Sequence, residues 1–148
     1  MGVCYELVVI ADSEVDRLTE DDFYTLDLPW EDNRGLTLEL LAELLSILSD
    51  KPVVQDLDAE FPLVSADDID NGPWAYRIST EFVGLLADVE DDEVEEIAHV
   101  WIPYEEPSPY TYPRPETCDF GKEYLHNLCR LSKLAISEKQ SLFLRISL

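Results

Sequence analysis

Apolar residues dominate both ends of the chain. Residues 3–11, VCYELVVIA, are rich in β-branched and aromatic side chains and are interrupted by Glu6. This pattern predicts a strand that is buried on much of both faces. Residues 141–148, SLFLRISL, also have the composition of a strand, and we expect the two terminal strands to lie in one sheet. Alternation places these apolar residues on one face of the second strand: Leu142, Leu144, Ile146 and Leu148.

Helical periodicity occupies most of the chain between these strands. The clearest helix is predicted over residues 38–49, LELLAELLSILS, where Thr37 is the N-cap and the polar positions form one narrow stripe. Because this segment is apolar around most of its circumference, we expect it in the core rather than against a partner. Further helices are predicted over residues 81–89, 93–101 and 122–137.

Start and stop signals bound the two middle helices. Ser79 or Thr80 is expected to cap the first of them, and Asp91 or Asp92 to begin the second. Pro103 is expected to stop or kink the second helix, because proline cannot continue the backbone hydrogen bonding.

The remaining segments predict shorter elements. Residues 13–18 are expected to form a short helix capped by Ser13, and residues 74–79 a short strand or an extended entry. Residues 19–35 are expected to be irregular or to form one short turn, and residues 50–73 a loop-rich crossing that ends in a turn.

These elements predict the α+β fold class, with a small sheet that includes the N- and C-terminal strands and is packed against four to five helices. The 148 residues fit one domain, 1–148, with a Pro/Tyr-rich loop at 103–117. A hydrophobic content of 46% excludes a disordered chain. No apolar run is long enough to span a membrane, and no secretory signal is recognised. Three cysteines without a dense framework indicate reduced thiols. A cytoplasmic location is therefore predicted.

Charge is the most unusual property of the chain. The net charge is −23, and all of the excess lies in residues 1–100, which carry 27 acids against four bases, while residues 101–148 carry six of each. Binding of nucleic acid or of an anionic membrane is disfavoured, because both require clustered Lys and Arg. A basic protein partner would be attracted by this field, although solubility alone explains the acidity equally well.

The acids are densest in residues 88–96, DVEDDEVEE. Acids near a helix N-terminus stabilise the helix dipole, and a run of charge is usually a solvated face. The alternative interpretation is a docking patch for a basic protein, or part of a nucleic-acid mimic. The candidate interaction patch comprises Asp88, Glu90, Asp91, Asp92, Glu93, Glu95 and Glu96.

Residues 101–118, WIPYEEPSPYTYPRPETC, concentrate five of the nine prolines. Polyproline ligands have prolines three residues apart, and no two prolines here have that spacing. A stiff connecting loop is therefore favoured over a recognition motif.

Motifs for metals, cofactors and catalysis are weak or missing. The sequence DDIDNG at 67–72 resembles a calcium loop, but Ile69 and Ile78 fall at ligand positions, which rejects an EF-hand. His126, Cys129 and Cys118 supply too few ligands to indicate a zinc site. No nucleophile elbow, phosphate loop or dinucleotide fingerprint occurs, so we predict no metal, no cofactor and no catalytic residue.

Several short motifs together are similar to a known family. The segments follow one another in this order: MGVCYELVVI, a Leu-rich helix, FPLV, GPWAYRISTEFVGLLADV, VWIPYE, a last helix and SLFLRIS. This order resembles that of the YfbM-like small bacterial proteins, which are classed as a domain of unknown function. The resemblance implies an α+β domain of bacterial type. It implies no activity, and no functional residue is carried over from it. The long proline–tyrosine insertion and the heavier acidity depart from that family.

The leading hypothesis is a non-enzymatic protein–protein interaction module, such as an immunity-type protein that binds a basic toxin. The alternative is a small enzyme-like ligand-binding domain with a pocket formed by Trp74, Tyr76, Arg77 and His99. A third hypothesis is self-association, in which the basic face of the last helix, Lys122 to Lys133, contacts the acids of another copy; contact of this face with acids of the same copy is the alternative. The sequence does not decide between a monomer and a homodimer.

Overall fold

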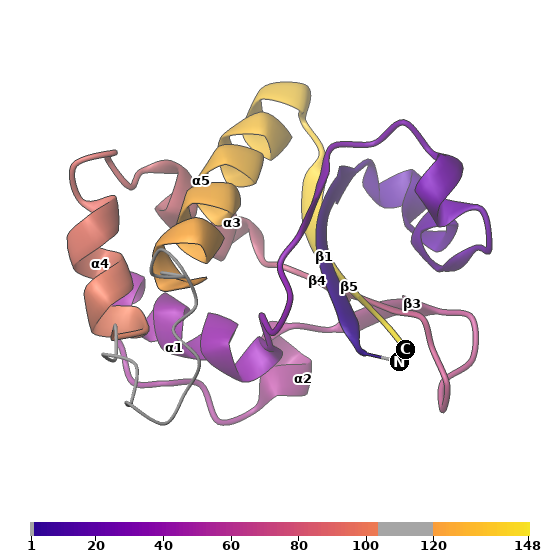
Figure 1. Ribbon diagram of the computed structural model, residues 1–148, viewed down its shortest axis with the longest axis horizontal. Helices are drawn as coiled ribbons and strands as arrows, with labels where there is room; N and C mark the ends of the chain where they lie inside the picture. The colour runs from indigo at the N-terminus through magenta and orange to yellow at the C-terminus, as the bar shows by residue number, and fades with distance from the viewer. Residues whose placement is uncertain (1, 104–119) are drawn as a thin grey trace, which may run out of the picture.

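The computed structural model describes residues 2–103 and 120–148, and its centre is a five-stranded antiparallel sheet with the order β2-β1-β5-β4-β3 (Figure 1). The terminal strands pair along their whole length, so the predicted α+β class, with both ends of the chain in one sheet, is confirmed. The strands are β1 (Cys4–Ile10), β2 (Trp30–Asp32), β3 (Leu63–Ala66), β4 (Trp74–Arg77) and β5 (Ser141–Ser147).

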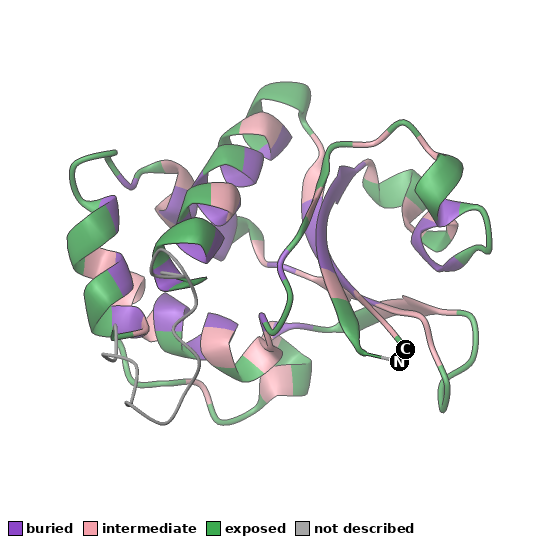
Figure 2. Cartoon of the chain, viewed as in Figure 1, coloured by how far each residue is buried: buried purple, intermediate pink, exposed green. Residues whose placement is uncertain are grey.

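One face of the sheet is covered by α-helices. The helices are α1 (Leu38–Ser49), α2 (Leu57–Glu60), α3 (Thr80–Ala87), α4 (Val94–Trp101) and α5 (Phe120–Glu138). Figure 2 shows that their buried positions lie on the sides that face the sheet and one another, while the outer sides are exposed. Leu7 and Val9 of β1, together with Leu142 and Leu144 of β5, join the main hydrophobic core from the sheet side.

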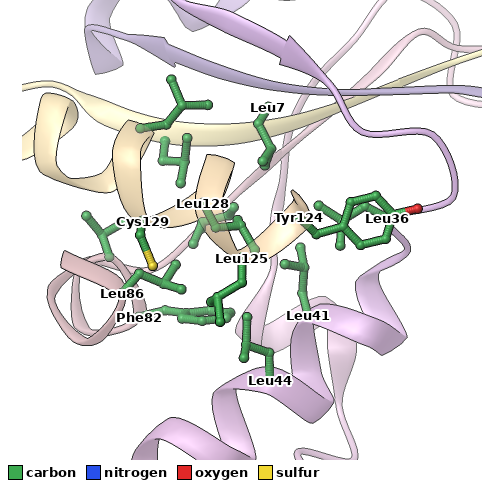
Figure 3. Packing of buried hydrophobic residues seen from close by; sticks show 14 of the residues in the cluster. Leu7, Leu36, Leu41, Leu44, Phe82, Leu86, Tyr124, Leu125, Leu128 and Cys129 are labelled. Atoms are coloured by element: carbon green, nitrogen blue, oxygen red, sulfur yellow. The ribbon is translucent and has the colours of Figure 1, made fainter. Parts of the chain in front are cut away.

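Helix α1 has the bounds and the cap that the sequence predicts. The Thr37 hydroxyl accepts a hydrogen bond from the Leu40 amide at 3.2 Å, which satisfies one of the free amides of the first turn. Leu41 and Leu44 are fully buried and pack in the core with residues of α3 and α5 (Figure 3). The Trp101 indole N–H donates to the Leu40 carbonyl at 2.7 Å and ties the end of α4 to this helix.

The other face of the sheet is covered by two short 3-10 helices, η1 (Asp12–Thr19) and η2 (Phe23–Thr25). Leu18 and Phe23 from these helices pack on Val8 and Phe143, and form a second, smaller core. The sheet is therefore buried on both faces along β1 and β5, as the nearly continuous apolar runs of these strands predict.

Several local predictions differ from the structure. The N-cap position of η1 is occupied by Ala11, two residues before the predicted Ser13, and alanine has no side-chain oxygen that could cap the helix. Helix α4 begins at Val94, with Glu93 at its N-cap position, rather than at Asp91 or Asp92. The short edge strands β2 and β3 and helix α2 lie in segments predicted to be irregular or loop-rich. Pro103 follows the end of α4, in agreement with its predicted role.

The predicted Pro/Tyr-rich loop at 103–117 falls almost entirely outside the described residues. Within the described residues, no helix has the length and apolarity that crossing a membrane requires.

Candidate functional site

The acidic segment, residues 88–96, connects α3 to α4 and includes the first turn of α4. All seven carboxylates of the candidate patch are exposed, whereas Val89 and Val94 are buried. The Glu93 carboxylate accepts a hydrogen bond from the Glu90 amide at 3.0 Å, and the Glu93 amide donates to the Glu90 carbonyl at 2.9 Å. The two valines thus fix the segment to the core and the carboxylates point to solvent.

The four residues predicted to form an enzyme-like pocket are not brought together. Side chains alternate along β4, so Trp74 and Tyr76 lie on the helix-covered face, where Tyr76 packs on the main core, while Arg77 lies on the other face. His99 is exposed on α4. Alternation along β4 therefore separates Arg77 from Trp74 and Tyr76, which the predicted pocket at Trp74, Tyr76, Arg77 and His99 groups together.

Arg77 also has a carboxylate partner. Its guanidinium contacts Asp12 of η1 through two nitrogens, at 2.9 and 3.2 Å, and one nitrogen lies 3.4 Å from the Ser141 hydroxyl. This bidentate pair links η1 to the sheet and occupies the Arg77 guanidinium with a carboxylate of the same chain.

Part of the basic face of α5 makes contacts within the same chain. Arg130 forms an ion pair with Glu31 of β2, and the Asn127 side chain donates to the Asn33 side chain at 3.0 Å. These contacts join the last helix to the edge strand of the same copy.

Sequence reasoning missed a buried ion pair in the middle of the sheet. Glu6 on β1 and Arg145 on β5 are cross-strand partners, and their side chains are 2% and 5% exposed. Arg145 reaches both Glu6 oxygens at 3.3 Å and donates from Nε to the Leu18 carbonyl at 2.6 Å. The sequence contains one signal for this pair. Each of the two terminal strands is otherwise apolar and carries one charged residue, and the two charges have opposite sign.

Aromatic residues surround this pair. The Arg145 guanidinium lies 4.2 Å from the centre of the Phe23 ring and 5.2 Å from that of Tyr24, in the geometry of a cation–π interaction. The Tyr24 hydroxyl donates to Glu6 at 2.5 Å. Partial burial and this bond to a carboxylate raise the pKa of Tyr24 above its ordinary value.

Two of the aromatic side chains are nevertheless open to solvent. Tyr24 is 56% and Trp30 37% exposed, and their ring centres are 5.9 Å apart in an edge-on arrangement. We call Tyr24 and Trp30 the aromatic surface. It lies above Phe23, Glu6 and Arg145 at the edge strand β2.

Two small hollows lie elsewhere on the molecule. One, of about 220 Å³, is lined by Ile78, Val83, Ala135 and Leu142, with Lys139 and Ser141 as polar neighbours. The other, of about 230 Å³, is lined by Ser46, Ser49, Lys51, Glu60 and Glu81, and the Lys51–Glu81 ion pair at 3.5 Å lies within it. Neither hollow includes a residue of the predicted pocket.

Within residues 2–103 and 120–148, no group of three or more His, Cys, Asp or Glu side chains could hold a metal ion. Asp68 instead accepts hydrogen bonds from the Asp70 amide and the Asn71 side chain, which stabilise the turn. Cys129 is buried, and burial raises the pKa of its thiol to about 11, while Cys118 lies outside the described residues.

Comparison with protein-family models, with curated proteins and with solved structures finds no match to this chain. The resemblance to the YfbM-like proteins therefore stays a prediction from short motifs.

Proposed function

We propose that this protein is an interaction module whose acidic surface engages a basic protein. One concrete form is an immunity-type protein that covers the active site of a basic toxin. We propose that the protein meets this partner in the cytoplasm. The free thiols of Cys4 and Cys129 support this location, because thiols stay reduced there.

The observation that carries the proposal is the exposure of the carboxylates. Of the 27 acids in residues 1–100, all are exposed except Glu6, which is buried, and Glu31 and Glu60, which are half-buried. Charges at the surface produce a field of several kT that attracts an oppositely charged partner and accelerates association.

The few bases of this region do little to reduce the field. Arg17 pairs with Glu14 at 3.1 Å, Lys51 with Glu81 at 3.5 Å and Arg77 with Asp12 at 2.9 Å. Each pair cancels one carboxylate, and most of the 27 acids keep an uncompensated charge. A surface of one dominant sign favours a partner of the opposite sign.

The proposal is tested by affinity capture from a native lysate with the tagged protein at low and at high salt. We expect a protein of basic isoelectric point to be captured at low salt and lost at high salt. Capture that is insensitive to salt, or the capture of neutral and acidic proteins alone, would contradict the proposal.

A variant of the acidic segment then shows whether this segment is the contact. All seven carboxylates of residues 88–96 are changed to the corresponding amides, which keeps their size and removes their charge. If the acidic segment is the contact, this variant loses the partner at low salt. If the contact lies elsewhere on the acidic surface, the variant still captures it, with slower association.

A further inference from the structure

The aromatic surface lies far from the acidic segment. Tyr24 belongs to η2 and Trp30 to β2, on the face of the sheet that the short helices cover, whereas residues 88–96 lead into α4. Figure 1 shows α4 and the short helices at opposite ends of the molecule. A partner held at one of these sites is therefore distinguishable from a partner held at the other.

The aromatic surface is held rigidly from below. Phe23 is buried, and its ring centre is 5.1 Å from that of Tyr24 and 6.2 Å from that of Trp30. The hydrogen bond from Tyr24 to Glu6 fixes the outer ring over the buried ion pair. Little side-chain entropy remains to be lost on binding, which is the property of a preorganised contact.

The surroundings of the aromatic surface are acidic. Asp21, Asp22 and Asp27 lie within three residues of Tyr24 in the chain, and all three are exposed. Asp32 is exposed two residues after Trp30, and alternation along β2 places its side chain on the same face of the sheet. The underlying Arg145 is buried and neutralised by Glu6, so it does not offset this charge at the surface. Arg34, just beyond β2, is the exposed base closest in sequence to Trp30.

We propose that Tyr24 and Trp30 are the anchor point for a Lys or Arg side chain of the basic partner. A cation over the face of an aromatic ring is attracted by the negative face of the ring, and the surrounding carboxylates can pair with neighbouring bases of the same segment. Exposed Trp and Tyr inside a charged rim are also the residue types that dominate binding energy at interfaces.

This inference deepens the proposed function and rests on it, because it specifies where and by which chemistry the basic protein is held. If Tyr24 served only to shield the Glu6–Arg145 ion pair from water, an exposed ring at Trp30 would not be needed. The charge of the surroundings favours a cationic segment over an apolar one.

The test is an amide and indole NMR titration of the whole protein at low salt. The probe is a short blocked peptide in which arginine alternates with glycine, and the matched control peptide carries uncharged citrulline in place of arginine. We expect the arginine peptide to shift the Trp30 indole N–H signal and the amides around Tyr24, and the citrulline peptide to leave them unchanged.

The other outcomes overturn the inference in separable ways. Shifts confined to residues 88–96, or spread evenly over all acids, would reject the aromatic anchor and leave the proposed function standing. A neutral leucine-containing peptide that shifts Trp30 as strongly would reject recognition of a cation. If the arginine peptide shifts no signal at low salt, both the inference and the proposed function fail.

A variant at Trp30 measures the contribution of the aromatic ring to binding apart from that of the surrounding carboxylates. Trp30→Leu keeps an apolar side chain on β2 and the same net charge, and we expect it to weaken arginine-peptide binding by about threefold to thirtyfold, the range of a cation–π contact. Val100→Ala, a change at an exposed apolar position of α4, is the matched control and should leave binding unchanged. Equal affinities of wild type and Trp30→Leu would overturn the inference.

Discussion

Glu6 and Arg145 show what a single residue can and cannot reveal in the sequence. Glu6 is visible as an interruption of an apolar strand, but its partner is 139 positions away and becomes its neighbour only through the register of β1 and β5. The same is true of the aromatic surface, because Tyr24 and Trp30 meet only after the chain turns back into the edge strand β2. Side-chain chemistry that depends on non-local pairing was not predictable.

Removal of one member of the buried ion pair should be strongly destabilising. Glu6→Leu or Arg145→Met leaves an uncompensated buried charge, and we expect each to lower the free energy of unfolding by about 3–5 kcal/mol. The double variant replaces both charges by apolar groups and should recover much of this loss. Urea unfolding of the four proteins measures the coupling, and losses that simply add would show that the pair does not act as a unit.

Cys129 makes the free energy of unfolding depend on pH, and the direction of this dependence follows from its pKa. Burial, with Lys133 opposing and Asp91 assisting, raises the pKa of its thiol from 9.0 to about 11. Because the unfolded thiol loses its proton at lower pH than the folded thiol, the stability due to Cys129 is complete below about pH 9 and is lost as the pH rises to about 11.

The matched protein for this measurement is Cys129→Ala. Every other titratable group is the same in both proteins, so the difference between the two unfolding curves isolates the thiol. We expect the advantage of the wild type over the variant to shrink by up to about 3 kcal/mol between pH 8 and pH 11. A constant difference across this range would show that the thiol has an ordinary pKa.

At the scale of elements, predictions succeeded where the determining forces are local. The bounds of α1 follow from a cap at Thr37 and an apolar surface that continues for three turns, and both signals lie within the segment. The edge strands β2 and β3 contain only three and four residues, and their structure depends on hydrogen bonds to β1 and β4. Such short strands have no pattern of their own, which explains why they were predicted as irregular.

Two helical glycines should respond to the same change with opposite sign. A Cβ at Gly84 of α3 would meet nothing within 4 Å, whereas one at Gly121 of α5 would lie 3.0 Å from Ile102 Cβ and 3.1 Å from the Ala98 carbonyl oxygen. Alanine has a higher helix propensity than glycine, so Gly84→Ala should raise the free energy of unfolding by about 0.5–1 kcal/mol. Gly121→Ala should lower it, because α5 would be pushed away from α4.

Each glycine variant serves as the control for the other, since the chemical change is identical. Thermal unfolding followed by circular dichroism gives both shifts, upward for Gly84→Ala and downward for Gly121→Ala. A stabilised Gly121→Ala protein would mean that α4 and α5 approach less closely than the structure shows.

At the scale of the whole molecule, the sequence predicted the fold class and the acidic surface for different reasons. Terminal strands of nearly continuous apolar character require cover on both faces, and α-helices and 3-10 helices supply it on opposite sides of the sheet. Net charge needs no fold to be counted, and acids are expected at the surface in any fold. The prediction that grouped Arg77 with Trp74, Tyr76 and His99 did not take strand alternation into account, which places Arg77 on the opposite face of the sheet from Trp74 and Tyr76, where it pairs with Asp12.

The central claim is that charge on this surface brings a basic protein to it. The most direct test is the association rate constant of the captured partner, measured in stopped flow as a function of salt concentration. We expect the rate constant to fall by at least about tenfold from low to high salt, with a much smaller change in the dissociation rate constant. An association rate constant that does not depend on salt would contradict the account.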